Sequence, residues 1–351
     1  MIDFRYHLVS IVAVFLALAI GIVLGSTELQ GPTYNLLDRT TAKLQAELNQ
    51  VSGQRNTAQA QAQVGEAYAQ AVEPAVLHDL LAGQRLLIVT EPGASASVVA
   101  GITNAATADA GATVTGQIAL QNKFFDNSDT TLDFLNQTNQ AVAQPAGIQL
   151  TTGETYQQQA AEVMAREILV KSAGSAPNQS GVIQPAGSEP DSTVQAMLEA
   201  YANSGFLTTS GQPYLPATLV IVVTPQTAPS DGTADPLDAV LIPLATELST
   251  YSAATVVVGT SAGSGPGSPI SVLRANSVAN QVSTVDDTDL VSGQTVAIES
   301  LAVLLSGGKA GSYGLTANGA TAVAPSPAPT PSASVSPSVS PSPTPTKKVK
   351  K

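Results

Sequence analysis

Three acidic residues near the end of the globular region, Asp286, Asp287 and Asp289, stand close enough in the sequence to act together. They follow the apolar segment 282–285, which is typical of a strand, and they precede a predicted helix. Carboxylate oxygens in such a loop could bind a hard cation such as Ca²⁺ or Mg²⁺. Acidic side chains in front of a helix also stabilise the positive end of its dipole, and we expect this simpler role.

Side chains for nucleophilic, acid–base or soft-metal chemistry are scarce. The chain has no cysteine, which excludes disulfides, zinc–thiolate sites and a cysteine nucleophile. Its two histidines, His7 and His78, precede the globular region, and the sequence contains no G-x-S-x-G motif. We therefore predict no catalytic residue, no metal-binding residue and no enzymatic activity.

Two loop segments could bind an anion through backbone N–H groups. Residues 90–95 (Thr-Glu-Pro-Gly-Ala-Ser) connect a predicted strand to a predicted helix. Residues 259–267 are rich in glycine and follow another strand, where α/β proteins usually bind ligands. Neither segment has the spacing of a dinucleotide-binding or P-loop motif. We expect the second to be a flexible loop.

These loops belong to a globular region, residues 84–320, in which short apolar runs alternate with helical patterns. Apolar runs at 85–90, 217–224 and 254–259 predict buried strands. Helices are predicted at 95–110, 155–172, 191–203, 235–251 and from about 292 to Gly307. Strands that are apolar on both faces and separated by helices predict an α/β fold with a doubly wound, mostly parallel, Rossmann-like sheet.

An uncharged apolar segment, residues 8–24, precedes the globular region. As a helix it would be about 25 Å long, near the lower limit for crossing a bilayer. Alternatives are a cleaved signal peptide, which the n-region and cleavage site fit poorly, and a buried core helix. We expect an uncleaved single-pass transmembrane helix over 8–25. Arg5 places residues 1–7 in the cytoplasm and the residues after Ser26 outside the cell membrane.

Two features predict self-association. Gly21 and Gly25 have the G-x-x-x-G spacing that lets membrane helices pack closely, although small residues are common in such helices anyway. Residues 34–76 carry apolar residues at seven-residue intervals, with breaks at Arg55 and Gly65. They predict a coiled-coil stalk and a parallel homodimer, with a single solvated helix packed on the globular region as the alternative. The seam includes Leu37, Leu44, Leu48 and Val51.

The C-terminal residues 324–351 are almost entirely Ala, Pro, Ser, Thr and Val before a lysine-rich end. This composition predicts a disordered, polyproline-like tail. Its basic end suits an anionic wall polymer or a membrane surface, unless it only improves solubility. The net charge of −12 for the whole chain argues against nucleic-acid binding.

The first 25 residues read MIDFRYHLVSIVAVFLALAIGIVLG, and this segment resembles the N-terminus of the actinobacterial copper transporter MctB family. Residues 282–287 (Val-Ser-Thr-Val-Asp-Asp) and the helix that runs toward Gly314 resemble the C-terminal region of that family. The resemblance covers residues 1–316 and marks a family-motif loop as a candidate binding site, namely Ser283, Thr284, Asp286 and Asp287. It implies a membrane or outer-membrane channel protein in copper transport or homeostasis; copper enters only by this resemblance, and no cofactor is predicted.

The residues themselves also suit a second role. Cu(I) favours Cys, Met and His ligands, but the methionines are only Met1, Met164 and Met197. A channel needs several spanning helices or a closed barrel, and the sequence predicts one spanning helix. The alternative is a non-enzymatic coiled-coil scaffold that acts through an envelope protein partner in cell-wall hydrolysis or cell separation.

Overall fold

The structure is a computed structural model that describes residues 4–28, 30–171, 192–229 and 238–316. The chain divides into two compact units, Met1–Ala67 and Tyr68–Lys351. The predicted tail, residues 324–351, lies outside the described residues.

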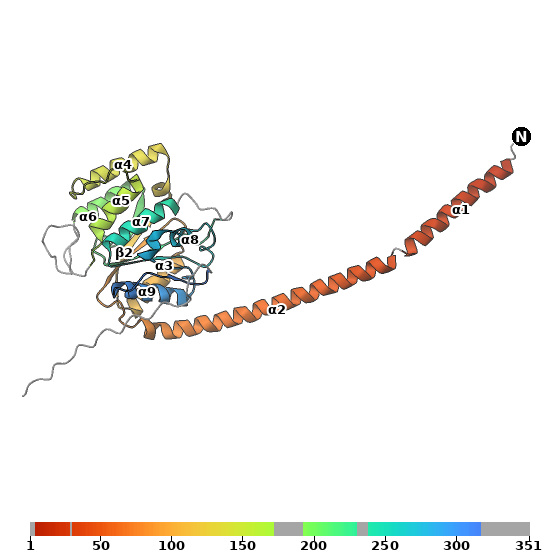
Figure 1. Cartoon of the computed structure of the whole chain (residues 1–351), viewed down its shortest axis with the longest axis horizontal. Helices are drawn as coiled ribbons and strands as arrows, with labels where there is room; N and C mark the ends of the chain where they lie inside the picture. The colour runs from red at the N-terminus through yellow and green to blue at the C-terminus, as the bar shows by residue number, and fades with distance from the viewer. Residues whose placement is uncertain (1–3, 29, 172–191, 230–237, 317–351) are drawn as a thin grey trace, which may run out of the picture. The chain divides into compact units, whose positions relative to one another are not determined.

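The first unit is helical. Helix α1 (Phe4–Glu28) contains the segment Arg5–Gly25, the one stretch in the described part of the chain that is long and apolar enough to cross a membrane. Helix α2 (Gln30–Leu77) follows it and includes the whole predicted stalk (Figure 1). Side chains are exposed to solvent over residues 5–25 of α1 and over residues 38–64 of α2. The expected apolar N-terminal helix is therefore present, and the coiled coil stays a prediction.

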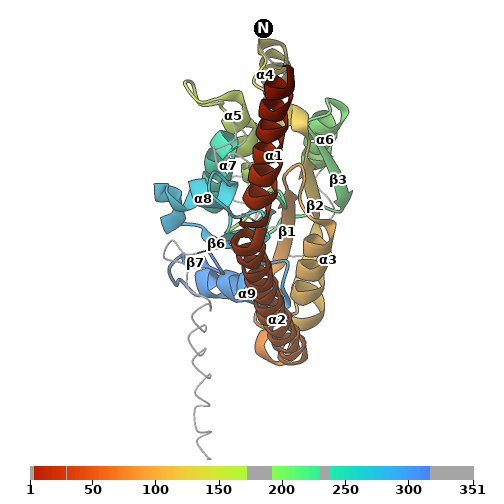
Figure 2. The ribbon, with the colours of Figure 1, turned by 90° about the vertical axis from the view of Figure 1, so that its right-hand side faces the viewer.

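The second unit is built on a sheet that has seven strands within the described residues, in the order β3-β2-β1-β4-β5-β6-β7. All neighbouring strands are parallel except β3, which runs antiparallel to β2. Figure 2 shows β3, β2 and β1 from right to left, with β6 and β7 further to the left, toward the opposite edge of the sheet. The strands are β1 (Arg85–Thr90), β2 (Thr113–Leu120), β3 (Leu207–Gly211), β4 (Leu219–Val223), β5 (Ala254–Val258), β6 (Ser283–Val285) and β7 (Ser312–Tyr313).

Helices cover both faces of this sheet, because the central strands are apolar on both sides. Leu87 and Val89 of β1 belong to one buried cluster, whereas Leu86 and Ile88 belong to the other. The first cluster packs under α4 (Asp129–Ala143), α5 (Tyr156–Ile168), α6 (Ser192–Asn203), α7 (Asp238–Tyr251) and α8 (Pro269–Arg274). The second packs under α3 (Ala96–Asn104), the short π-helix η1 (Ala105–Asp109) and α9 (Val291–Leu305) (Figure 1). The predicted mixed α/β fold with a mostly parallel sheet is confirmed.

The last turns of α2 belong to the core of the second unit. Leu77, and Leu81 just beyond the helix, are fully buried in the cluster beneath α3 and α9. The Thr295 hydroxyl of α9 donates a hydrogen bond to the Glu73 carboxylate at 3.1 Å. The end of the predicted stalk is thus an integral part of the α/β unit rather than a separate linker.

Several elements differ from the sequence-based expectation. The 15-residue helix α4 is not among the predicted helices. The polar strand β3 (Leu-Thr-Thr-Ser-Gly) was not predicted, because an edge strand with four exposed residues has no apolar run. The predicted helix 95–110 changes at Ala105 into the π-helix η1. Short elements such as η2 (Asn122–Phe125) and η3 (Ser277–Asn280) also carry no periodic signal.

Candidate functional site

The loops that the sequence singled out converge at the carboxyl ends of the parallel strands. The loop after β1 bonds to β4, where the Glu91 N–H donates to the Val223 carbonyl at 3.0 Å. The loop after β6 bonds to the end of β5, where the Thr288 N–H donates to the Gly259 carbonyl at 3.0 Å. The glycine-rich loop and the acidic loop therefore meet, as parallel strands require.

Asp286 is the centre of a buried polar network. Its side chain is fully buried, and Arg274 Nη1 donates to its Oδ2 at 2.6 Å. The Leu315 N–H donates to its Oδ1 at 2.6 Å, and the Thr316 hydroxyl donates to its Oδ2. Position 314, next to the Asp286 carboxylate, requires a glycine. The φ of Gly314 is +118°, and a Cβ there would overlap the carboxylate. Asp286 therefore ties α8, β6 and the chain after β7 together, and removing either charge of such a buried pair is costly.

The rest of the family-motif loop is also internal. Thr284 is fully buried, and its hydroxyl accepts a hydrogen bond from Arg274 Nε at 2.8 Å. The Ser283 hydroxyl accepts one from the Gly311 N–H at 3.2 Å. Ser283, Thr284 and Asp286 are thus used by the fold, so the structure gives no support for an open binding surface at these three residues.

Asp287 differs from its neighbour. Its side chain is 7% exposed, and its Oδ1 has no hydrogen-bond partner. It lies against the first turn of α9, where a Cβ on Gly293 would stand 2.6 Å from that oxygen. Burial raises the pKa of Asp287 to about 6, and repulsion by Asp286 and Asp289 adds to the rise.

The three acids do not act as one group at the start of α9. Asp289 is exposed, and its Oδ1 accepts hydrogen bonds from the Ser261 N–H at 2.7 Å and the Ser261 hydroxyl at 2.9 Å. Asp286 faces Arg274, and only Asp287 packs on the first turn of the helix. Within the described ranges, no group of three or more His, Cys, Asp or Glu residues is arranged to hold a metal ion.

The glycine-rich loop is closely packed rather than open. A Cβ on Gly259 would lie 2.7 Å from side-chain atoms of Ile270 and Thr224. A Cβ on Gly263 would lie 2.4 Å from the Pro225 carbonyl oxygen. These glycines allow close approach of the loops after β4 and β5, which replaces the expectation of a flexible loop with a packing role.

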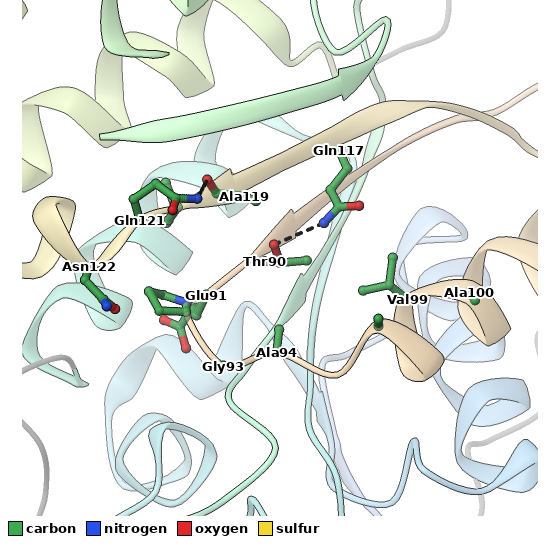
Figure 3. A pocket seen from close by; sticks show the side chains of 13 residues that line it. Thr90, Glu91, Gly93, Ala94, Val99, Ala100, Gln117, Ala119, Gln121 and Asn122 are labelled. Carbon is green, nitrogen blue, oxygen red and sulfur yellow. Dashed lines mark hydrogen bonds between the residues drawn. The ribbon is translucent and has the colours of Figure 1, made fainter. Parts of the chain in front are cut away.

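An open cavity of about 540 Å³ lies at the carboxyl ends of β1 and β2. Figure 3 shows Thr90 and Glu91 from the end of β1, Gln117 from β2, and Val99 and Ala100 from α3 around it. Gln117 Nε2 donates to the Thr90 hydroxyl at 3.2 Å. The sequence indicates that segment 90–95 could bind an anion, without the spacing of a known motif. The Gln117 carboxamide of β2 gives no sequence signal, because glutamine has no characteristic spacing.

The residues predicted to mediate self-association are unpaired in one chain. A Cβ added to Gly21 or Gly25 would meet no atom within 4 Å. Leu44, Leu48 and Val51 are all more than half exposed. The side chain of Leu37 is not among the side chains that the structure describes. Their roles in helix packing and in a coiled coil stay predictions.

Soft metal ligands are dispersed. Met164 and Met197 are buried in the cluster beneath α5 and α6. The His78 side chain is exposed and lies 3.2 Å from the Asp79 carboxylate. These three side chains therefore form no shared copper site within the described part of one chain.

The family model and the similar proteins that match this chain all carry the same family name. Residues 1–325 match the family model described as "Copper transport outer membrane protein, MctB". The chain is 29% identical to the copper transporter MctB of Mycobacterium leprae over 329 residues, which cover 92% of this chain and 99% of that protein. It is 28% identical over 326 residues to the proteins of the same name from Mycobacterium bovis and Mycobacterium tuberculosis, with the same coverage. Because the family match spans nearly the whole chain, this protein belongs to the MctB family.

Proposed function

We propose that this chain is a membrane-anchored protein of copper transport. The observation that carries the proposal is the family match over residues 1–325. The relatives named copper transporters are also matched over 99% of their length. The apolar helix α1 supports membrane attachment. The alternative role as a scaffold for cell separation is less well supported, because the relatives carry the name of a transporter.

Copper is the cargo in this proposal, and the ligands of one chain do not suggest a path through the α/β unit. Met164 and Met197 lie in its core, and no acidic or histidine cluster among the described residues could hold the ion. One spanning helix cannot enclose a pore. We therefore propose that several chains associate through Gly21 and Gly25 in α1 and through the leucine seam of α2, first as a parallel homodimer.

We further propose the arrangement of the chain in the envelope. Arg5 favours a cytoplasmic N-terminus, which would place α2 and the α/β unit outside the cell membrane. The strand order around β1 and β4, with helices on both faces, supports a Rossmann-like unit without a nucleotide fingerprint. There this unit could contact an envelope protein partner or an anionic wall polymer.

A deletion strain tests the copper role. Loss of the gene is expected to change the copper content of cells grown in excess copper and the copper concentration that stops their growth. The full chain should restore both values, whereas a chain without residues 4–28 should not, because it lacks the membrane helix. Cellular copper is measured by mass spectrometry. Normal copper content together with unseparated daughter cells would reject transport and favour the scaffold role.

A further inference from the structure

We propose that the cavity at the carboxyl ends of β1 and β2 binds a neutral, polyhydroxylated small molecule, namely a sugar or a nucleoside ring. This site is separate from the acidic loop and from the copper role. Its cavity of about 540 Å³ lies within the range of roughly 300–1,000 Å³ that is typical of small-molecule sites.

The position of the cavity favours a ligand site. In parallel α/β sheets, ligands bind outside the carboxyl ends of the strands near the point where the strand order reverses. In this sheet the order reverses between β1 and β4, so the cavity lies beside that point. Here the chain leaves β1 through Gly93, whose φ of +83° makes the turn, and enters α3. The carbonyl of Gly93 accepts a hydrogen bond from the Gln226 N–H at 3.0 Å, which holds this turn in place.

The polar groups of the cavity are fixed before any ligand arrives. The Gln117 carboxamide donates a hydrogen bond to the hydroxyl of Thr90, a buried residue that is 4% exposed. The Gln121 carboxamide donates to the Ala119 carbonyl at 3.0 Å and to the Thr208 hydroxyl at 3.3 Å. Groups that are held in one orientation lose little entropy on binding, so they favour affinity and specificity.

The chemistry of the lining selects the ligand class. The side chains of Glu91, Gln117, Gln121 and Asn122 offer one carboxylate and three carboxamides, which hydrogen-bond well to hydroxyl and amide groups. Small apolar side chains, among them Ala96, Val99, Ala100 and Ala119, form the remaining wall and suit the C–H surface of a ring.

The side chains of the lining disfavour two other classes of ligand, phosphates and copper ions. Neither Lys nor Arg lines the cavity, so no cationic side chain there would compensate the charge of a phosphate group. His, Cys and Met are also missing from the lining, which makes it a poor site for copper. A neutral ligand with several hydroxyl groups fits best.

The test uses the full-length protein in detergent with two probes, the disaccharide of N-acetylglucosamine and adenosine. Binding is measured by saturation-transfer NMR and by isothermal titration calorimetry. We expect one of the two probes to bind. Binding of the disaccharide would show a preference for a sugar, and binding of adenosine a preference for a nucleoside. Gln117→Leu should weaken its binding by about tenfold, the value of one net hydrogen bond.

Two alanine variants provide a matched pair. Ala100 is exposed on α3 at the cavity wall, and Ala108 is exposed in η1 away from it. Ala100→Leu should fill the cavity and abolish saturation transfer, whereas Ala108→Leu should bind like the wild type, and both should keep its melting temperature. Lack of binding of both probes, equal loss in both alanine variants, or tighter binding of adenosine triphosphate or putrescine than of either probe would overturn the proposal.

Discussion

Adjacent aspartates in this protein have opposite environments. Asp286 is compensated by Arg274 and by several hydrogen bonds, whereas Asp287 has an oxygen without a partner. The two residues follow one another in the sequence, so composition and spacing cannot distinguish them. The difference arises because alternate residues at the end of β6 point to opposite faces of the sheet.

The raised pKa of Asp287 has a consequence for stability. Its pKa of about 6 in the folded protein lies above the usual aspartate value of 3.8, so the folded state binds the proton more tightly. The stabilisation by this proton is complete below the unfolded pKa and is lost as the pH rises through about 6. Asp287→Asn should therefore raise the free energy of unfolding at pH 7.5 by about 1–2 kcal/mol, a value reduced for solvent screening near the surface.

This gain should shrink when the pH is lowered from 7.5 to 5, because the wild-type carboxyl group then carries its proton. Thermal and denaturant unfolding across this pH range measure it. Asp133→Asn, at an exposed position of α4, is the matched control and should change stability little at any pH. A stabilisation by Asp287→Asn that does not depend on pH would contradict the assigned cause.

At the scale of elements, the two ends of α2 have different environments. Its last turns, which belong to the second unit, are buried against α9, as the hydrogen bond between Thr295 and Glu73 shows. Its seam residues Leu44, Leu48 and Val51 remain exposed. An apolar seam of this kind is typical of a helix that pairs with a second copy.

The stalk dimer can be tested by charge substitution. Leu44→Asp combined with Val51→Asp should weaken self-association of the full-length protein by at least about tenfold, because carboxylates would be buried in the apolar seam. Sedimentation equilibrium in density-matched detergent measures the dissociation constant.

The control for this variant is Ala46→Asp combined with Asn49→Asp, which adds the same charge on the same helix away from the seam. It should associate like the wild type. Equal weakening by both double variants would show a general effect of charge, and a wild-type protein that is monomeric at high concentration would reject the dimer.

At the scale of the whole molecule, the cysteine-free sequence gives a clean test of orientation. Ser97→Cys introduces one thiol at an exposed position of α3, and Asp3→Cys introduces one before α1. A membrane-impermeant maleimide should label the first in intact cells and the second only after lysis. The wild type is the unlabelled control, and labelling in the reverse pattern would contradict the proposed orientation.

Much of the architecture could be predicted because it depends on local patterns. The strand Arg85–Thr90 has the predicted bounds, and the helix before Gly307 ends where a glycine with a φ of +81° stops it. The edge strand β3 could not be predicted, because its pairing with β2 depends on residues about 90 positions away rather than on its own apolar content.

The amino-acid sequence by itself determined the apolar helix α1, the helical stalk, the α/β class and the family, because hydrophobic periodicity and a contiguous N-terminal motif are properties of neighbouring residues. Only the tertiary structure decided what the singled-out side chains do. Arg274 meets Asp286 and Thr316 across three separate segments, and the cavity arises where β1, β2 and α3 come together. Such contacts join positions far apart in the chain, so their chemistry appears only when the sheet has brought them to one place.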